Sequence, residues 1–331
     1  MQATHRRAFV QQLVAGSLLP ALGLPALAQT QEIDTVKVVV GFVPGGTTDA
    51  IGRRVAEKLR GTYAKNVLVD NRAGAAGQIA VQYTKTAAPD GTTLLVSPSG
   101  QLSVFPHIYS KLPYDAFTDV TPVSIATIFD HALAVGPAVP ASVRTVPEFL
   151  AWCKAHPDQA NFGSPGAGTV AHFVGELLSR AGNAGLRHAA YRGSQPAIAD
   201  MLGGQLTAVQ SALGDFMPHL AGGRCRLLGT SGAKRSRFTP NVPTYAEQGL
   251  KDVVINEWFG FFAPGKTPPE LVQRANRALR TALATPEVVD GLATMALEAS
   301  SSSPAELSER LRRDYEYWGP VVKAIGFKAE G

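Results

Sequence analysis

The segment Val36-Lys-Val-Val-Val-Gly-Phe-Val-Pro-Gly-Gly-Thr-Thr-Asp49 carries the first prediction of the fold. Its apolar first half predicts a buried strand. The Gly/Thr loop that follows opens a helix in which Ile51, Val55 and Leu59 recur at helical spacing. The first N–H groups of a helix have no partner within it and lie at the positive end of its dipole. A strand–loop–helix unit of this kind therefore predicts a site for an anion.

The loop at the start of this helix combines accessible backbone with hydroxyl groups. Gly45 and Gly46 let a ligand approach the backbone, and Thr47 and Thr48 add hydroxyl donors. Asp49 has two possible roles: the common one, capping the helix by accepting backbone N–H bonds, and contact with a ligand hydroxyl or a water. We expect the ligand contacts of this loop to be Phe42, Pro44, Gly45, Gly46, Thr47, Thr48 and Asp49.

A second loop of similar design, Asn161-Phe-Gly-Ser-Pro-Gly-Ala-Gly-Thr169, leads into a helix that carries His172. Ser164, Thr169 and the glycine amides, including that of Gly168, can hold a second negative group. His172 lies in the first turns of the helix and is among the expected ligand contacts, with a neutral, hydrogen-bonded imidazole as the simpler role. A catalytic histidine would need a nucleophile, and the chain has no Gly-x-Ser-x-Gly elbow.

The third loop is Tyr191-Arg-Gly-Ser-Gln-Pro196. Ser194 suits an N-cap, with Pro196 in the first turn of the helix. Arg192 can pair with a carboxylate through two hydrogen bonds, or it can remain solvated. Amide-rich loops spread over both halves of one chain indicate capture of a small carboxylate or phosphate.

Strand and helix signals alternate along most of the chain, which predicts an α/β fold with a parallel or mixed sheet covered by helices. Capping-box spacings at Thr145, Thr267 and Ser303 predict three helices in addition to those with clear periodicity. We expect strands at 36–43, 67–71, 93–97, 161–164, 189–191, 206–210, 225–230 and 258–263, and periodic helices at 50–59, 78–87, 170–181 and 195–202.

Residues 1–28 have the features of a cleavable secretion signal: Arg6 and Arg7, an apolar stretch, and Ala26-Leu-Ala28 at the cleavage point. His5-Arg-Arg-Ala-Phe-Val10 also fits a twin-arginine signal, so both the Sec and the twin-arginine routes remain open. The formal charge of +5 comes without a long Lys/Arg run. This argues against nucleic acid as a partner, whereas a mild positive field suits a small anion.

Other chemistry finds little support in the sequence. Cys153 and Cys225 are either bonded or two semi-buried thiols, and no Cys/His cluster has metal-ligand spacing, so we expect neither a metal nor a cofactor. The segment Gly260-Phe-Phe-Ala-Pro-Gly-Lys-Thr267 matches the Walker A pattern. We reject nucleotide binding there, because its phenylalanines continue a strand and the neighbouring prolines remove N–H donors. Thr267 is better interpreted as a helix cap.

Several motifs in the same order make the chain similar to the substrate-binding proteins of tripartite tricarboxylate transporters, the Bug (Bordetella uptake gene) family. The resemblance covers essentially the whole chain after the leader. The motifs are Phe42-Val-Pro-Gly-Gly-Thr-Thr-Asp49, Val69-Asp-Asn-Arg-Ala-Gly-Ala-Ala-Gly77, Ala88-Pro-Asp-Gly-Thr-Thr-Leu94, Gly163-Ser-Pro-Gly-Ala-Gly-Thr169, Tyr191-Arg-Gly-Ser-Gln-Pro-Ala197, Val242-Pro-Thr-Tyr-Ala-Glu-Gln-Gly249 and Trp258-Phe-Gly-Phe-Phe-Ala-Pro264.

The resemblance implies a two-lobed periplasmic-binding-protein (Venus flytrap) fold, each lobe a mixed sheet flanked by helices. The first lobe would comprise 30–131 and 250–331, and the second 132–249. One carboxylate of the ligand would be held by the Pro-Gly-Gly loop and the Gly-Thr loop of the other lobe. The family often has Asp where this chain has Thr207, so any role of that acid does not carry over. The distal end of the ligand would meet Ser97, Ser99, Arg192, Ser194 and Asp215.

From this we expect a monomeric periplasmic protein, not an enzyme, that captures a small organic acid and delivers it to the membrane permease subunits of a tripartite transporter. Two alternatives from other classes remain. One is a sensor subunit that presents its ligand to a signalling receptor. The other is an exported hydrolase or isomerase, which would need Asp49, His172 and Asp215 to converge.

Overall fold

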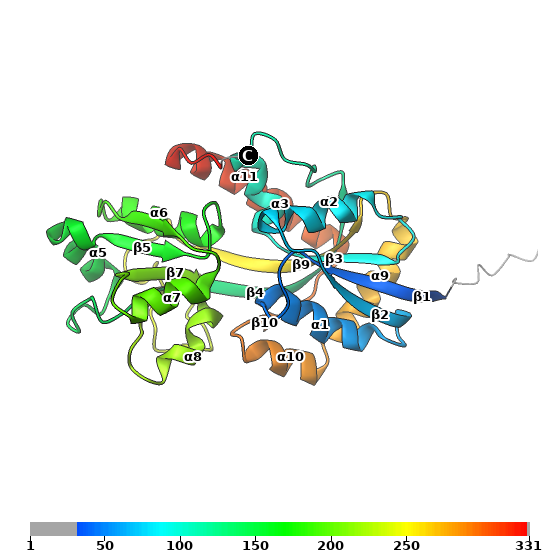
Figure 1. The fold of residues 1–331 in the computed structure, drawn as a ribbon. Coiled ribbons are helices and arrows are strands. Elements are labelled where there is room, and N and C mark those ends of the chain that lie inside the picture. The colour runs from blue at the N-terminus through cyan, green and yellow to red at the C-terminus, as the bar shows by residue number, and fades with distance from the viewer. Residues whose placement is uncertain (1–31, 330–331) are drawn as a thin grey trace, which may run out of the picture. The chain divides into compact units, whose positions relative to one another are not determined.

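The predicted buried strand is β1 (Ile33–Val40) in the computed structural model, which describes residues 32–329 (Figure 1). β1 pairs in parallel with β2 (Ala64–Asn71) on one side and with β3 (Thr93–Pro98) on the other. The valines at positions 36 and 38–40 are fully buried. A strand covered on both faces has a continuous apolar sequence, which explains the run that precedes the Gly/Thr loop.

The strands form one path in the order β2-β1-β3-β9-β4-β7-β5-β6, and β8 and β10 both pair with β4. β9 runs antiparallel to both β3 and β4, whereas β5 runs parallel to β6 and β7. The path therefore mixes parallel and antiparallel pairs, as predicted. The remaining strands are β4 (Val120–Val135), β5 (Asn161–Ser164), β6 (Arg187–Ala190), β7 (Ala208–Ala212), β8 (Arg226–Thr230), β9 (Asn256–Pro264) and β10 (Glu298–Ala299).

The long strand β4 belongs to two sheets. Up to Asp130 it pairs with β9 and β10, and from His131 onward it pairs with β7 and β8. We call the strands on the β9 side the first sheet and those on the β7 side the second sheet. β4 was not predicted from the sequence, because Pro122 and the adjacent polar residues Asp130 and His131 interrupt its apolar pattern.

Helices cover both faces of the first sheet (Figure 1). The core on one face joins β1 and β9 to the helices α1, α9 and α10, and the core on the other face joins them to α2, α3 and α11. These helices are α1 (Thr47–Leu59), α2 (Gln78–Thr86), preceded by the turn η1 (Ala75–Gly77), α3 (Gly100–Ser103), α9 (Pro269–Leu283), α10 (Pro286–Ala293) and α11 (Pro304–Ile325).

The second sheet is covered in the same way. One core contains side chains of α4, α5 and α6, and the other contains side chains of α7 and η3. Helix α11 contributes to the cores of both sheets, with Leu307 and Leu311 in one and Trp318 and Val322 in the other. The elements are α4 (Phe105–Ile108), α5 (Val146–Ala155), η2 (Pro157–Gln159), α6 (Val170–Ala181), α7 (Ser194–Leu202), η3 (Leu213–Phe216) and α8 (Met217–Leu220).

Two of the three predicted capping boxes are confirmed. Thr145 and Ser303 each bond the backbone three residues ahead and complete a reciprocal box, with Glu148 and Glu306 respectively. The box at Thr267 is wrong. Helix α9 starts at Pro269, its N-cap is Pro268, and the Thr267 hydroxyl donates to the carbonyl of Pro264 at 2.8 Å. The prolines shift the helix start past the position where Glu270 would complete the box.

Other expectations concern single features. The Walker-like segment lies in β9 and the turn after it, with Phe261 and Phe262 fully buried, which confirms its strand context. Cys153 and Cys225 are both free and buried, so they do not form a disulfide. None of the helices between residues 32 and 329 combines the length and the hydropathy needed to span a bilayer. The predicted signal peptide, residues 1–28, lies outside the described part of the chain.

The packing of α6 on β5 depends on a glycine and gives a first test. A Cβ added at Gly175 would lie 2.1 Å from Cε2 of the fully buried Phe162. We expect Gly175→Ala to lower the free energy of unfolding by about 1–2 kcal/mol, because the overpacking outweighs the gain in helix propensity. Urea unfolding followed by circular dichroism measures this. Gly222→Ala is the matched control, since a Cβ there meets nothing within 4 Å; equal stability of the two variants would contradict the packing argument.

Candidate functional site

The predicted site residues lie on connections that follow the carboxyl ends of strands. β1 and β3 are parallel neighbours, and they lead into the loop before α1 and into α3. β5 and β6 are parallel neighbours as well, and they lead into the loops before α6 and α7; β7 leads into η3, which contains Asp215. In open α/β sheets ligands bind outside the carboxyl ends of strands. The topology therefore supports the placement predicted from the loops.

Asp49 does not cap α1. The N-cap is Gly46, which makes no side-chain cap bond, and Asp49 lies inside the first turn. Its Oδ2 accepts hydrogen bonds from the N–H of Gly45 and from Nε of Arg53, both at 2.8 Å. The prediction that Asp49 is the helix cap was therefore wrong. Asp49 is the third residue of the helix, and its carboxylate reaches back to the loop backbone, as acids at this position commonly do.

This arrangement changes which backbone groups remain available to a ligand. The N–H of Gly45, expected as an anion donor, is already bonded to Asp49. The first-turn N–H groups that follow Gly46 have no capping side chain, and the first N–H groups of a helix have no partner within it. The donors that this loop still has available are therefore the first N–H groups of α1. Gly45 has a φ of +89°, a backbone conformation that residues other than glycine adopt only at an energetic cost.

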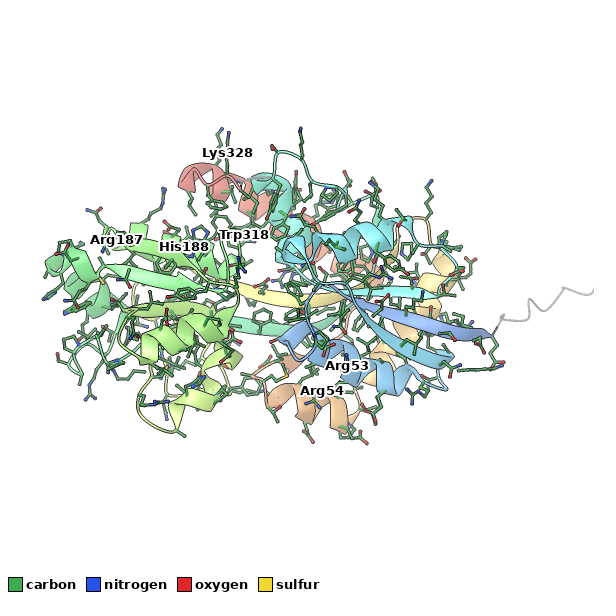
Figure 2. All side chains as sticks on the ribbon, in the orientation of Figure 1. Arg53, Arg54, Arg187, His188, Trp318 and Lys328 are labelled. Carbon is green, nitrogen blue, oxygen red and sulfur yellow. The ribbon has the colours of Figure 1, made fainter. Side chains whose placement is uncertain are left out.

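Two residues missed by the sequence analysis hold Asp49 in place. Nδ2 of Asn71 donates to Oδ1 of Asp49 at 2.8 Å and to the carbonyl of Phe42 at 3.1 Å, so it links both ends of the loop. Arg53 lies one helical turn after Asp49 (Figure 2). Burial alone would raise the pKa of Asp49, but the hydrogen bonds from Arg53, Gly45 and Asn71 outweigh it and lower the pKa. The four-residue spacing of Asp49 and Arg53 was the available sequence signal.

The hydroxyls of the second loop bond within the loop. Thr169 is the N-cap of α6: its Oγ1 accepts the N–H of His172 at 3.2 Å and donates to the carbonyl of Gly166 at 2.8 Å. Ser164 Oγ lies 3.0 Å from the same carbonyl and 2.7 Å from Nε2 of His188. These hydroxyls shape the loop, and the first turn of α6 lies directly behind it.

His172 has the neutral, hydrogen-bonded arrangement that was expected. Its Nδ1 accepts the N–H of Gly168 at 3.1 Å, so this nitrogen carries no proton. The ring stacks on His188 of β6, with centroids 3.8 Å apart. Burial lowers the pKa of His188 to about 3. His188, labelled in Figure 2, belongs to no recognisable motif and was therefore not predicted as a site residue.

In the third loop, Ser194 is the first residue of α7 and not its N-cap, which is Gly193 with a φ of +109°. Ser194 instead bonds to the carboxylate of Asp215. Ser211 Oγ donates to Oδ2 of Asp215 at 2.5 Å. Burial raises the pKa of Asp215, and the two serine bonds oppose this. Arg192 is exposed. The carboxylate of Asp215 therefore links Ser194 of the third loop to Ser211 near the end of β7.

Beside the end of β3, Glu257 of β9 and His131 of β4 form a buried, hydrogen-bonded pair, and neither residue was predicted from the sequence. Ser99 Oγ lies 3.4 Å from Oε1 of Glu257, and Oε2 of Glu257 lies 2.9 Å from Nε2 of His131. The side chain of Ser97 donates to Oε1 of Gln101 at 2.6 Å. His131 is the residue at which β4 changes sheets. The sequence did contain a signal for this pair, because Asp130-His131 and Glu257 are polar residues within otherwise apolar strands.

A cavity of about 340 Å³ opens next to this pair. Ser99 and Glu257 line it, together with Val170 of the first turn of α6. It therefore joins the carboxyl edge of the first sheet to the helix that follows the second loop. Its other lining residues are Val254, Ile255, Asn256 and, on α11, Arg310, Arg313, Asp314, Tyr317 and Trp318.

The residues proposed for the hydrolase alternative have separate partners. Asp49 bonds to Gly45, Arg53 and Asn71; His172 bonds to its own loop; Asp215 bonds to serines. Between residues 32 and 329, no group of three or more His, Cys, Asp or Glu side chains is arranged to hold a metal ion. The arrangement offers helix starts and polar acceptors, which suit binding of a small polar molecule.

The chain is similar to known proteins over most of its length. The chain is 31% identical to Protein BugT of Bordetella pertussis over 318 residues, which covers 95% of this chain and 97% of BugT. MatC of Rhodopseudomonas palustris, solved with bound malate, superposes with a TM-score of 0.78 at 28% identity, over 88% of this chain and 99% of MatC. A second protein of R. palustris, solved with adipate, gives a TM-score of 0.81 at 28% identity, over 89% of this chain and 98% of that one.

The family model described as "Tripartite tricarboxylate transporter family receptor" matches residues 51–327. The match begins inside α1 and extends beyond the end of α11, so it includes every strand except β1. The periplasmic binding protein BugD superposes with a TM-score of 0.79 at 26% identity, over 90% of this chain and 99% of BugD, which confirms the periplasmic-binding-protein type of α/β fold that the resemblance implied. This chain belongs to the tripartite tricarboxylate transporter receptor family.

Proposed function

We propose that this protein is a periplasmic receptor that captures a small organic carboxylate and delivers it to the permease subunits of a tripartite transporter. The observation that carries the proposal is the start of α1, where Gly46 leaves the first-turn N–H groups uncapped at the carboxyl edge of the sheet. Fixed backbone dipoles at a helix start bind anions without a cationic side chain. Malate and adipate bound to the two related structures are ligands of this class.

The proposed ligand contacts remain those of the three loops and the edge of β3, with their roles refined by the geometry. The first loop would hold a carboxylate through the first-turn N–H groups of α1. The second loop would present backbone, because the Thr169 and Ser164 hydroxyls bond to Gly166. Arg192 is exposed and available to the ligand.

Capture would proceed by closure of two lobes, 30–131 with 250–331 and 132–249. The change of partners along β4, between Asp130 and His131, supports a boundary at this point. A strand that continues from one sheet into the next can bend there while the pairing on each side is kept. We further propose a monomeric, non-catalytic protein, supported by the separate partners of Asp49, His172 and Asp215.

Substitution of the helix cap tests the anion site. Gly46 has extended backbone dihedrals, φ −80° and ψ 173°, which an aspartate adopts without strain. In Gly46→Asp the new carboxylate would cap α1 and occupy its free N–H groups with like charge. We expect the fold to be retained and affinity for the tightest-binding acid to fall at least about a hundredfold, as repulsion of a few kcal/mol implies.

Isothermal calorimetry measures this loss, with malate and adipate as first probes and a wider thermal-shift screen of organic acids to find the tightest ligand. Gly46→Asn is the matched control, because it adds a cap of the same shape without the charge. Wild-type affinity in the folded Gly46→Asp variant would rule out this helix start as the anion site.

The network around Asp49 predicts a pH dependence of stability. Its pKa is lowered in the folded state, so its contribution is present above the unfolded pKa and is lost as the pH falls through the lower folded value. We expect Asp49→Asn to lower the free energy of unfolding by about 1.5–3 kcal/mol at neutral pH, as bonds to a charged group contribute. The difference from wild type should shrink below about pH 3.8.

Urea unfolding at a series of pH values measures both effects. Asp158→Asn, at an exposed position, serves as the control and should match the wild type throughout. A difference between Asp49→Asn and wild type that is independent of pH would show that the carboxylate charge is not what holds the loop.

A further inference from the structure

The second loop packs against a segment that follows it in the chain by about 160 residues, as the positions of Gly168 and Phe327 show. A Cβ added to Gly168 would lie 3.4 Å from Cε1 of Phe327 and 2.6 Å from Cδ1 of Ile108. Gly168 has a φ of +76°, a conformation that favours glycine. The loop backbone therefore passes between two apolar side chains on a path that leaves no room for a side chain of its own.

Phe327 also contacts the histidine that fixes this backbone. Its ring meets that of His172 edge to face, with centroids 5.0 Å apart and planes at 80°, and it meets Phe173 in the same way at 5.7 Å. Nδ1 of His172 accepts the N–H of Gly168 at 3.1 Å. Phe327 therefore packs on the buried imidazole that in turn holds the Gly168 peptide.

The segment that carries Phe327 is itself fixed on both sides of this residue. Gly326, with a φ of +77°, ends α11 in the left-handed conformation and donates its N–H back to the helix. Beyond Phe327, the N–H of Ala329 donates to the carbonyl of Ile108 at 3.0 Å. The side chain of Lys328, between them, is exposed (Figure 2). The ring of Phe327 is thus held against the loop by backbone bonds on either side.

Helix α11 connects this segment to both sheets. Leu307 and Leu311 lie in a core of the first sheet, whereas Trp318 and Val322 lie in a core of the second. The position of the helix end is therefore set by contacts with both sheets. Phe327 ties the second loop to this helix end, so the loop cannot shift relative to α11 without losing its contacts with the ring.

We propose that Phe327 is a positioning residue for ligand binding: it holds the second loop, through Gly168 and His172, in the arrangement that receives the ligand. The inference rests on the proposed function, since it takes this loop as a ligand contact and adds what fixes its conformation. Removing the ring leaves a cavity beside Gly168 and gives the loop other positions. A protein whose binding-competent state is only partly populated has an affinity reduced by that fraction.

Calorimetry on the full protein measures the effect on binding, with malate, adipate and any tighter acid from the thermal-shift screen as probes. We expect Phe327→Ala to bind about tenfold more weakly than the wild type, as a loop that is competent about a tenth of the time implies. Phe327→Leu keeps most of the apolar volume and should stay within about threefold of the wild type.

Phe117→Ala is the matched control. Phe117 also packs edge to face on an aromatic ring of α11, that of Tyr315, with centroids 5.1 Å apart, but it belongs to none of the three loops. We expect its affinity for every probe to equal that of the wild type.

Amide hydrogen exchange measures the loop without a ligand. We expect peptides that cover residues 161–173 to exchange faster in Phe327→Ala than in the wild type, and peptides that cover 42–55, from the first loop and α1, to be unchanged. Ala329→Pro is the second variant if Phe327→Ala does not fold, because it removes the N–H that bonds to Ile108 and leaves the ring in place. It should accelerate exchange in the same peptides and weaken binding, both to a smaller extent.

The possible results separate the inference from the proposed function. Equal affinity of the wild type, Phe327→Ala and Phe117→Ala would overturn the inference. Faster exchange spread evenly over the whole second sheet would overturn it too, because Phe327 would then stabilise the sheet without placing the loop. Failure of every acid to bind the wild type would instead overturn the proposed function, and the exchange comparison would still decide whether Phe327 fixes the loop.

Discussion

The structure depends on a single strand that two sheets share. β4 pairs with β9 up to Asp130 and with β7 from His131 onward. The pairing of the first sheet therefore ends, and that of the second sheet begins, at two consecutive residues of the same strand. The polar groups of the site gather around this point: His131 bonds to Glu257 of β9, and Glu257 lies beside Ser99 at the end of β3. Placing charged residues inside an apolar strand is costly, and here they are paired.

In the loops that were predicted to donate hydrogen bonds to the ligand, the backbone N–H groups and the side-chain hydroxyls have different roles. The first-turn N–H groups of α1 have no capping side chain, while the side-chain hydroxyls of the loops bond to carbonyls and carboxylates of the protein. Asp49 illustrates the principle, since it consumes one loop amide to fix the geometry of the others. A loop held by such internal bonds would not have to be ordered on binding a ligand, which would reduce the entropic cost of association.

Sequence patterns predicted the local elements well, because each was set by short-range signals. Asn161–Ser164 and Val170–Ala181 agree with β5 and α6 residue for residue, and the caps at Thr145 and Ser303 formed as their spacing indicated. The capping box predicted at Thr267 was wrong because Pro268 is the N-cap and α9 begins at Pro269. β4, His131 and Glu257 were missed because their roles arise from pairings between distant segments, which no local pattern encodes.

The position of β9 in the strand order has a consequence for biosynthesis. This strand lies between β3 and β4 in space, yet Asn256–Pro264 is translated after the entire second sheet. The amino-terminal strands therefore cannot complete their sheet until the last part of the chain has emerged from the ribosome. Contacts between such distant segments close slowly. The nascent polypeptide consequently stays incompletely folded for most of its synthesis, which lengthens the interval in which chaperones can engage it.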